Sequence, residues 1–404
     1  MNKKKILICD DDSTMAQNWK KQLDALTSVK REFVVEPLKK KDFEKCISQL
    51  EQRRLRARKK PGKSEIEDSI EFDETDILIL DYDLLNPKAE NSEAEKFIEG
   101  ETVAYLARCY SRCGLIVALN QFGVNSFDLT LKGHSEFYAD LNLGGKQISN
   151  KGLWSAMRTD FRSWSWPILP RACEALKQHA KELATTTNIN EPILSFLGFP
   201  DEVARILPRS TIEFIGGREN PEETTFKEFV ENSGNGLRGK DKPLNDDFVA
   251  RIAAARIAKW LERLVMPGQD ILIDAPHLIS RYPSLLQEKD RRKRGSWDKT
   301  SSFDVLNLGI LQDDNISAFR FEKDNWLSRP AWFWNKLSSF NKIDEVAKPW
   351  SIDRPDWVFC EDISRFLPRD EAREFVADLP SPYVRRFAKV VSGVDYTPQV
   401  RFSL

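Results

Sequence analysis

The sequence predicts a doubly wound α/β domain over residues 1–150, followed by a larger, mainly helical domain over residues 151–404. Three observations support this prediction. Short apolar runs alternate with helical patterns up to residue 150, as expected for a parallel sheet. Two of those runs end directly in aspartates. A chain of 404 residues also exceeds the ~250–300 residues that one hydrophobic core accommodates, so we expect two domains.

The elements of the first domain follow from these patterns. We expect buried strands where apolar residues run together, at residues 6–9, 33–35, 77–80 and 115–119. We expect helices where apolar residues recur at helical spacing, at residues 13–28, 41–58 and 101–112. Ser13 or Thr14 is the expected cap of the first helix. Residues 59–75 are polar and contain Pro61 and Gly62, which indicates a solvated excursion between elements.

Beyond Leu153 the pattern changes, because ten of the eleven tryptophans lie there and helical periodicity dominates. We expect helices at residues 169–185, 247–265 and 369–378, and a short strand at 271–273. An aspartate and a histidine, Asp274 and His277, follow that strand. They indicate either a polar site or an ordinary turn, and a turn is the more common arrangement. The three histidines, His134, His179 and His277, are far apart in the sequence, which favours structural roles for each.

Composition excludes several classes of protein. Lys and Arg number 62 against 63 Asp and Glu, so the chain has no overall charge that would attract nucleic acid. Six dispersed cysteines without a Cys-x-x-Cys pair indicate neither a disulfide framework nor a zinc site. No apolar run approaches the ~18–20 residues of a membrane span. We therefore expect a cytoplasmic protein that does not contact a membrane.

The aspartates at the strand ends carry the clearest chemical signal. Asp10 and Asp11 follow the first strand, and Asp81 follows the strand at 77–80. The carboxyl ends of adjacent parallel strands meet at one edge of a sheet, so these three acids can converge on one cation. Crowded carboxylates repel each other without a cation, and Mg²⁺ prefers oxygen ligands. The sequence therefore predicts a Mg²⁺ site at this edge.

At these residues the sequence resembles the receiver domain of bacterial response regulators. The matching segments are Lys5-Ile-Leu-Ile-Cys-Asp-Asp-Asp12, Asp76-Ile-Leu-Ile-Leu-Asp-Tyr-Asp83 with Pro87 beyond it, Gly100-Glu-Thr-Val-Ala-Tyr-Leu-Ala-Arg108 and Gly114-Leu-Ile-Val-Ala-Leu119. The resemblance covers just over a third of the chain and implies a flavodoxin-like fold. It also implies that Asp81 accepts a phosphoryl group from a partner histidine kinase. Asp10, Asp11 and the backbone carbonyl of Asp83 would then hold Mg²⁺ with Asp81.

The chain departs from the family pattern in three places. Asn120 stands where the family has a Ser or Thr that contacts the phosphoryl group. The Lys that pairs with the phosphoryl oxygens has no obvious equivalent, and Lys146 is our first candidate and Lys132 our second. The separation between Asp10 and Asp81 exceeds the usual spacing by the length of the polar excursion, which costs little in a loop. These departures put the conventional output switch in doubt.

No output module is apparent in residues 151–404. A receiver without an identifiable effector resembles the atypical response-receiver proteins of bacterial defence operons, and among them the phosphate-buffer receivers of Detocs-type anti-phage two-component systems. Three alternatives stay open. The chain could be a pseudo-receiver that binds a partner without phosphorylation. It could also be a response regulator whose second domain binds DNA, or one whose second domain is an enzyme.

Overall fold

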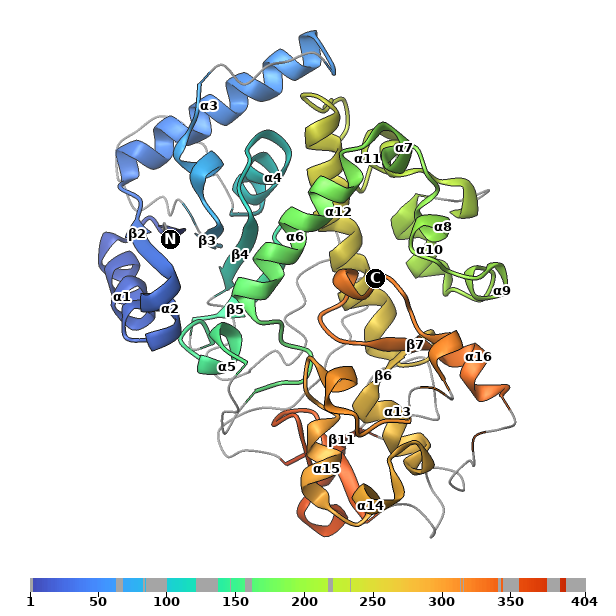
Figure 1. The fold of residues 1–404 in the computed structure, drawn as a ribbon. Helices are drawn as coiled ribbons and strands as arrows, with labels where there is room; N and C mark the ends of the chain where they lie inside the picture. Colours follow the sequence, from blue (N-terminus) through green and yellow to red (C-terminus); the bar gives the residue numbers. More distant parts are fainter. Residues whose placement is uncertain are drawn as a thin grey trace.

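The structure is a computed structural model that describes residues 3–62, 68–82, 84, 100–120, 137–145, 147–156, 162–216, 221–232, 234–312, 314, 316–340, 343, 356–375 and 386–389. Its first part is a five-stranded parallel sheet flanked by helices, which confirms the α/β class (Figure 1). The strands lie in the order β2-β1-β3-β4-β5. Their bounds are β1 Lys4–Cys9, β2 Phe33–Pro37, β3 Ile77–Asp81, β4 Leu115–Asn120 and β5 Leu141–Gly144.

Alternate residues of the strands face opposite sides of the sheet, and each side buries its own apolar layer. Ile6 and Ile8 of β1 face one layer with helix α1 (Ser13–Asp24), α5 (Lys151–Trp154) and the start of α6 (Leu169–Leu183). Leu7 and Cys9 face the other layer with α3 (Lys40–Lys59) and α4 (Gly100–Tyr110). Helices therefore cover both faces, as the continuous apolar runs of the strands require.

Helix α1 is shorter than expected, and its N-cap is Asp12, which lies one residue before the predicted cap. The side chain of Asp12, rather than that of Ser13 or Thr14, accepts hydrogen bonds from the backbone N–H groups of Thr14 and Met15. Aspartate is as good an N-cap as serine, which is why the residue just before the predicted cap can take that role. The expected helix at 13–28 ends at Asp24, and a separate helix α2 (Thr27–Glu32) leads into β2.

Helix α6 lies beyond residue 150 and nevertheless packs on the sheet. Lys177 of α6 forms an ion pair with Asp76, just before β3, and Glu174 pairs with Lys4 of β1 at 2.6 Å. Helix α12 (Asp246–Trp260) packs along α6 in turn (Figure 1). The apolar layer that contains Leu7 continues without a break into α12 and its neighbours. A division of the chain into domains near residue 150 stays a prediction.

The rest of the described chain combines short helices with two small sheets. The helices are α7 Thr186–Ile189, α8 Ile193–Phe196, α9 Asp201–Ala204, α10 Arg209–Ile215, α11 Phe226–Asn232, α13 Ala275–Arg281, α14 Glu288–Arg291, α15 Arg294–Lys299 and α16 Trp334–Ser338. The strands are β6 Leu272–Asp274 paired with β7 Ala331–Phe333, and β8 Trp357–Cys360, β9 Arg365–Pro368, β10 Arg373–Phe375 and β11 Arg386–Ala388 in the order β10-β11-β8-β9.

Two expectations for this region change. The helix predicted at 369–378 is wrong, because residues 369–371 form a 3₁₀ turn and β10 follows at residues 373–375. Antiparallel pairing with β11 overrides the weak helical pattern there. The periodic segment 247–265 is helical as expected, but α12 ends at Trp260 and a π-helical turn spans Leu261–Val265 before Pro267.

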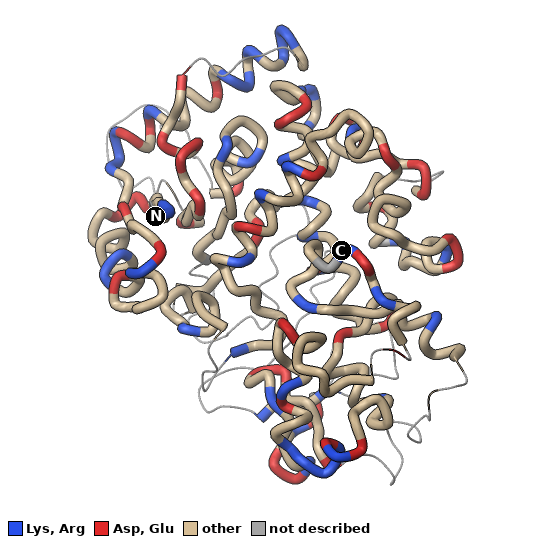
Figure 2. Tube along the Cα trace, in the orientation of Figure 1, with Lys and Arg blue, Asp and Glu red and all other residues tan. Residues whose placement is uncertain are grey.

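Charge is mixed over the molecule. Figure 2 shows basic and acidic residues interspersed along most elements, with a basic stretch at the end of α3, where Arg56, Arg58 and Lys59 lie in the last turn.

None of the helices in the described ranges combines the length and apolarity that a bilayer crossing needs.

Candidate metal centre

Asp10, Asp11 and Asp81 lie together at the carboxyl edge of the parallel sheet. Strands β1 and β3 are direct neighbours, and Cys9 pairs with Leu80, so the residues that follow each strand come out side by side. One carboxylate oxygen from each of the three aspartates lies within 4.8 Å of the others. Oxygen atoms at this spacing can reach one divalent cation with small side-chain adjustments. The convergence predicted from the sequence is present in the structure.

Asp10 is held in place by two hydrogen bonds. Its Oδ1 accepts from the backbone N–H of Asp12 at 2.9 Å, and its Oδ2 accepts from the indole Nε1 of Trp19 at 3.3 Å. Partial burial raises the pKa of Asp10, the two hydrogen bonds oppose this, and the negative charges of Asp11 and Asp12 add to it. Since the carboxylates repel each other, a bound cation would stabilise the ionised form of all three.

Asp81 is the most enclosed of the three acids, with 4% of its surface exposed. It is the last residue of β3, and it pairs with Leu119 of the neighbouring strand β4. The first turn of helix α4 lies against it. The backbone N–H of Gly100 donates to the carbonyl of Tyr82 at 2.8 Å, and a Cβ atom on Gly100 would overlap the backbone carbonyl of Asp81. A glycine at this position lets the first turn of α4 approach the backbone of Asp81 closely.

A cavity of about 190 Å³ opens beside the acids. Asp10 and Asp11 line it, together with Lys40 at the start of α3 and the apolar side chains of Phe43 and Leu84. A small donor molecule or a partner's side chain could therefore approach the carboxylates from this side. Lys40 is a cation that the sequence analysis did not single out. It lies in a run of three lysines, so sequence alone could not distinguish it.

Of the remaining predicted site residues, the structure describes only the backbone of Asn120. Asn120 is the last residue of β4, and its backbone pairs with Gly144 at the same edge of the sheet as Asp81. The position of its side chain lies outside what the structure describes. Asp83, Lys132 and Lys146 also lie outside the described residues, so their assigned roles stay predictions.

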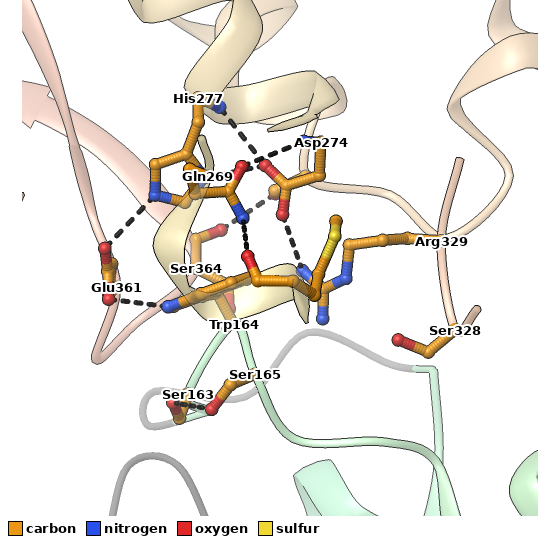
Figure 3. A network of polar contacts seen from close by, with 12 residues as sticks. Ser163, Trp164, Ser165, Gln269, Asp274, His277, Ser328, Arg329, Glu361 and Ser364 are labelled. Carbon is orange, nitrogen blue, oxygen red and sulfur yellow. Dashed lines mark hydrogen bonds and ion pairs between the residues drawn. The ribbon is translucent and has the colours of Figure 1, made fainter. Parts of the chain in front are cut away.

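A second polar cluster lies in the last part of the chain, around His277 (Figure 3). Asp274 caps helix α13 by accepting the backbone N–H of His277, and its Oδ1 also lies 2.6 Å from the Nδ1 of that histidine. The other ring nitrogen lies 3.1 Å from Glu361. Glu361 in turn accepts from the indole of Trp164 at 2.6 Å and forms an ion pair with Arg386.

The groups in this cluster balance each other's charge within the interior. Burial alone would lower the pKa of His277, but Asp274 and Glu361 outweigh burial and raise it. Burial would raise the pKa of Glu361, and Arg386 and His277 lower it instead. Asp274, His277 and Glu361 are each less than 9% exposed. The cluster connects β6 and α13 to the four-stranded sheet, which fits a structural role for Asp274 and His277.

All six cysteines are buried and free. His134 lies outside the described residues, and His179 is buried. Comparison of the chain with protein-family models, curated proteins and solved structures found no match in any of the three.

Proposed function

We propose that this chain is a phosphoacceptor protein in which Asp81 accepts a phosphoryl group in a Mg²⁺-dependent reaction. The observation that carries the proposal is the meeting of three carboxylates, from the ends of β1 and β3, within 4.8 Å of one another. A cluster of this kind provides the oxygen ligands of a divalent cation and an oxygen nucleophile in one place.

The topology of the sheet supports the finer assignment to a flavodoxin-like receiver fold. Strand order β2-β1-β3-β4-β5 is that of doubly wound folds in which the strand order reverses between the first and third strands. Ligands of open α/β sheets bind outside the carboxyl ends of the strands at that reversal. Asp10, Asp11 and Asp81 occupy this position.

The proposed reaction forms one bond and breaks one. A carboxylate oxygen of Asp81 attacks the phosphorus atom, and the donor's leaving group departs with the electron pair of the broken bond. For a phosphohistidine donor on a partner kinase, the leaving group is an imidazole nitrogen. Mg²⁺ at Asp10, Asp11 and Asp81 would neutralise charge on the phosphoryl oxygens. The nearby first turn of α4 would add a favourable dipole.

Acetyl phosphate with Mg²⁺ tests the acceptor role directly. Intact mass spectrometry should show one phosphoryl group on the wild type and none on Asp81→Asn. Asp12→Asn is the matched control, because it removes a neighbouring charge and keeps an N-cap for α1. We expect this control to be phosphorylated. Equal modification of wild type and Asp81→Asn would remove Asp81 from the role we give it.

The cation that pairs with the phosphoryl oxygens is a separate part of the proposal. Lys146 and Lys132 are the candidates from the sequence, and Lys40 joins them because it lines the cavity beside the acids. Replacing each lysine by Met and comparing the yield of phosphorylated protein would identify it.

A role as a phosphate buffer in anti-phage defence, with a histidine kinase as partner, rests on the resemblance alone and stays a prediction.

A further inference from the structure

A cavity larger than the one beside the acids lies at the opposite end of the sheet. It has a volume of about 500 Å³ and lies between helices α6 and α12. Leu115, the first residue of β4, forms part of its wall, whereas Leu119 at the other end of the strand pairs with Asp81. A cavity of this volume is within the range of small-molecule sites.

Small side chains on two facing helices leave this space open. Ala172 and Ala175 of α6 and Ala255 and Ala258 of α12 all line the cavity. Apolar side chains such as Leu176 and polar side chains share the remaining wall. A ligand with an apolar body would therefore find a matching surface between the helices.

His179 contributes an acceptor to the same cavity. It is 2% exposed and stacks on Trp326 with ring centroids 4.1 Å apart. Burial lowers its pKa to about 4, so the ring is neutral near pH 7. Its Nε2 lies 2.7 Å from the carbonyl of Asn325 and must donate to it, which leaves Nδ1 as an acceptor. This atom has no hydrogen-bond partner among the residues that the structure describes.

Three guanidinium groups gather at one end of the cavity, around the ring of Phe303. Those of Arg162, Arg171 and Arg329 lie 4.3, 5.8 and 5.5 Å from its centroid. Arg162 lines a second cavity of about 190 Å³, and Phe303 and Arg329 belong to the walls of both cavities. The two spaces therefore adjoin at this cationic cluster.

The cationic cluster is not fully paired within the described chain. Arg162 is 9% exposed, and its Nη2 has no hydrogen-bond partner among the described residues. Burial, followed by the charges of Arg329 and Arg171, lowers the pKa of Arg162 to about 9. Arg171 and Arg329 each have an acidic partner, because Arg171 forms an ion pair with Asp304 at 3.6 Å and Arg329 forms one with Asp274 at 3.8 Å. A buried cation without an acidic partner is costly, and an anionic ligand beside Arg162 would reduce that cost.

The backbone beside the cavity is also unusual. The π-helical turn Leu261–Val265 continues α12 and brings Glu262 and Arg263 to the cavity wall. Turns of this type are rare and often occur at functional sites.

We propose that these adjoining cavities bind one small organic anion, with its charged group among Arg162, Arg171 and Arg329 and its apolar body between α6 and α12. A hydrogen-bond donor on that body would pair with His179. This binding site is independent of the phosphoacceptor role of Asp81.

Two fluorescent probes that differ in one sulfonate group test the proposal. 8-Anilinonaphthalene-1-sulfonate has an aromatic apolar body, an N–H donor and a negative charge, and N-phenyl-1-naphthylamine lacks only the charged sulfonate group. We expect the wild-type chain to bind the sulfonate at one saturable site about tenfold more tightly than the neutral probe, which corresponds to roughly 1.4 kcal/mol. Failure to bind the sulfonate, or equal affinity for the two probes, would overturn the proposal.

Variants locate the site within the chain. Arg162→Gln and Arg171→Gln should each weaken binding of the sulfonate by about threefold or more and leave the neutral probe unaffected, as expected for lost ion pairs. Arg209→Gln, on the exposed face of α10, is the matched control. Ala258→Phe and the milder Ala175→Leu should block both probes by filling the cavity, whereas Ala184→Leu, exposed at the end of α6, should not. Unchanged binding by the cavity-filling variants would place the probe elsewhere.

Discussion

At the scale of single residues, the contact between Trp19 and Asp10 provides a reporter of metal binding. The indole N–H donates to the same carboxylate that we expect to hold the cation. We predict that Mg²⁺ changes tryptophan fluorescence in a saturable manner, because the cation and the indole compete for Asp10. Trp19→Phe should lose this signal, whereas Trp154→Phe, in the same apolar layer, should retain it.

The same measurement has a predicted pH dependence. The raised pKa of Asp10 means that its carboxylate begins to take up protons at a higher pH than an ordinary aspartate. Since protons and cations compete for it, the affinity for Mg²⁺ should fall as the pH is lowered through that pKa. An affinity for Mg²⁺ that Asp10→Asn leaves unchanged would contradict the assignment of Asp10 as a ligand.

Histidine 277 carries a second prediction at this scale. Its pKa is raised in the folded chain, so its contribution to stability is full below the unfolded-state pKa of about 6.5 and is lost as pH rises through the folded-state value. The lowered pKa values of Asp274 and Glu361 act in the opposite direction. Their contribution is full above the unfolded-state values of about 4 and is lost as the pH falls.

We therefore expect this cluster to stabilise the fold most between about pH 4.5 and 6.5. Urea unfolding of the wild type from pH 6 to 9 should show a decline in the free energy of unfolding that His277→Gln flattens. Glu361→Gln should cost about 3 kcal/mol or more, because it leaves Arg386 without its buried partner. A parallel pH profile for the wild type and His277→Gln would exclude this titration.

At the scale of elements, the approach of α4 to β3 depends on Gly100. We predict that Gly100→Ala destabilises the fold by about 1–3 kcal/mol, because its Cβ would overlap the carbonyl of Asp81 and push the helix away. It should also weaken Mg²⁺ binding. The control is Gly295→Ala in α15, where the added methyl meets no atom within 4 Å. That change should be neutral or stabilising by up to about 1 kcal/mol.

The elements also show how far the sequence could predict this structure. Strands β1, β3 and β4 were predictable within one or two residues, because uninterrupted apolar runs require burial on both faces. The acids at the ends of β1 and β3 followed from the same argument. Strand β10 was missed, since its pairing with β11 is a tertiary contact that three residues do not encode.

Other features depend on contacts between distant segments. The segment 169–185 was predicted to be helical, but nothing in it indicates that α6 would pack on the sheet through Lys177 and Asp76. Phe303 and Arg329 lie more than 100 residues after Arg162 and Arg171 in the sequence. Neither spacing nor composition could therefore predict that these four residues meet. The role of Trp19 beside Asp10 was likewise hidden, because a tryptophan on an amphipathic helix usually indicates only packing.

At the scale of the whole molecule, the packing joins the sheet to the later helices in one continuous apolar layer. Residues of β1, α4 and α12 belong to the same buried cluster. We therefore predict that a denaturant titration gives one transition for tryptophan fluorescence and for far-ultraviolet circular dichroism, because the two parts of the described chain share a core. Two separated transitions would favour domains that unfold independently.

Strand β4 extends this connection to the two proposed sites. Leu115 at one end of β4 lines the cavity, and Leu119 near the other end pairs with Asp81. The distance between these two residues along the strand is roughly 13 Å at ~3.3 Å per residue. Two ligands that bind at opposite ends of one short strand, buried from Leu115 to Leu119, can influence each other's binding if they shift the strand as a unit. Such coupling must be reciprocal, so a compound that alters the affinity for Mg²⁺ must have its own affinity altered by the same factor.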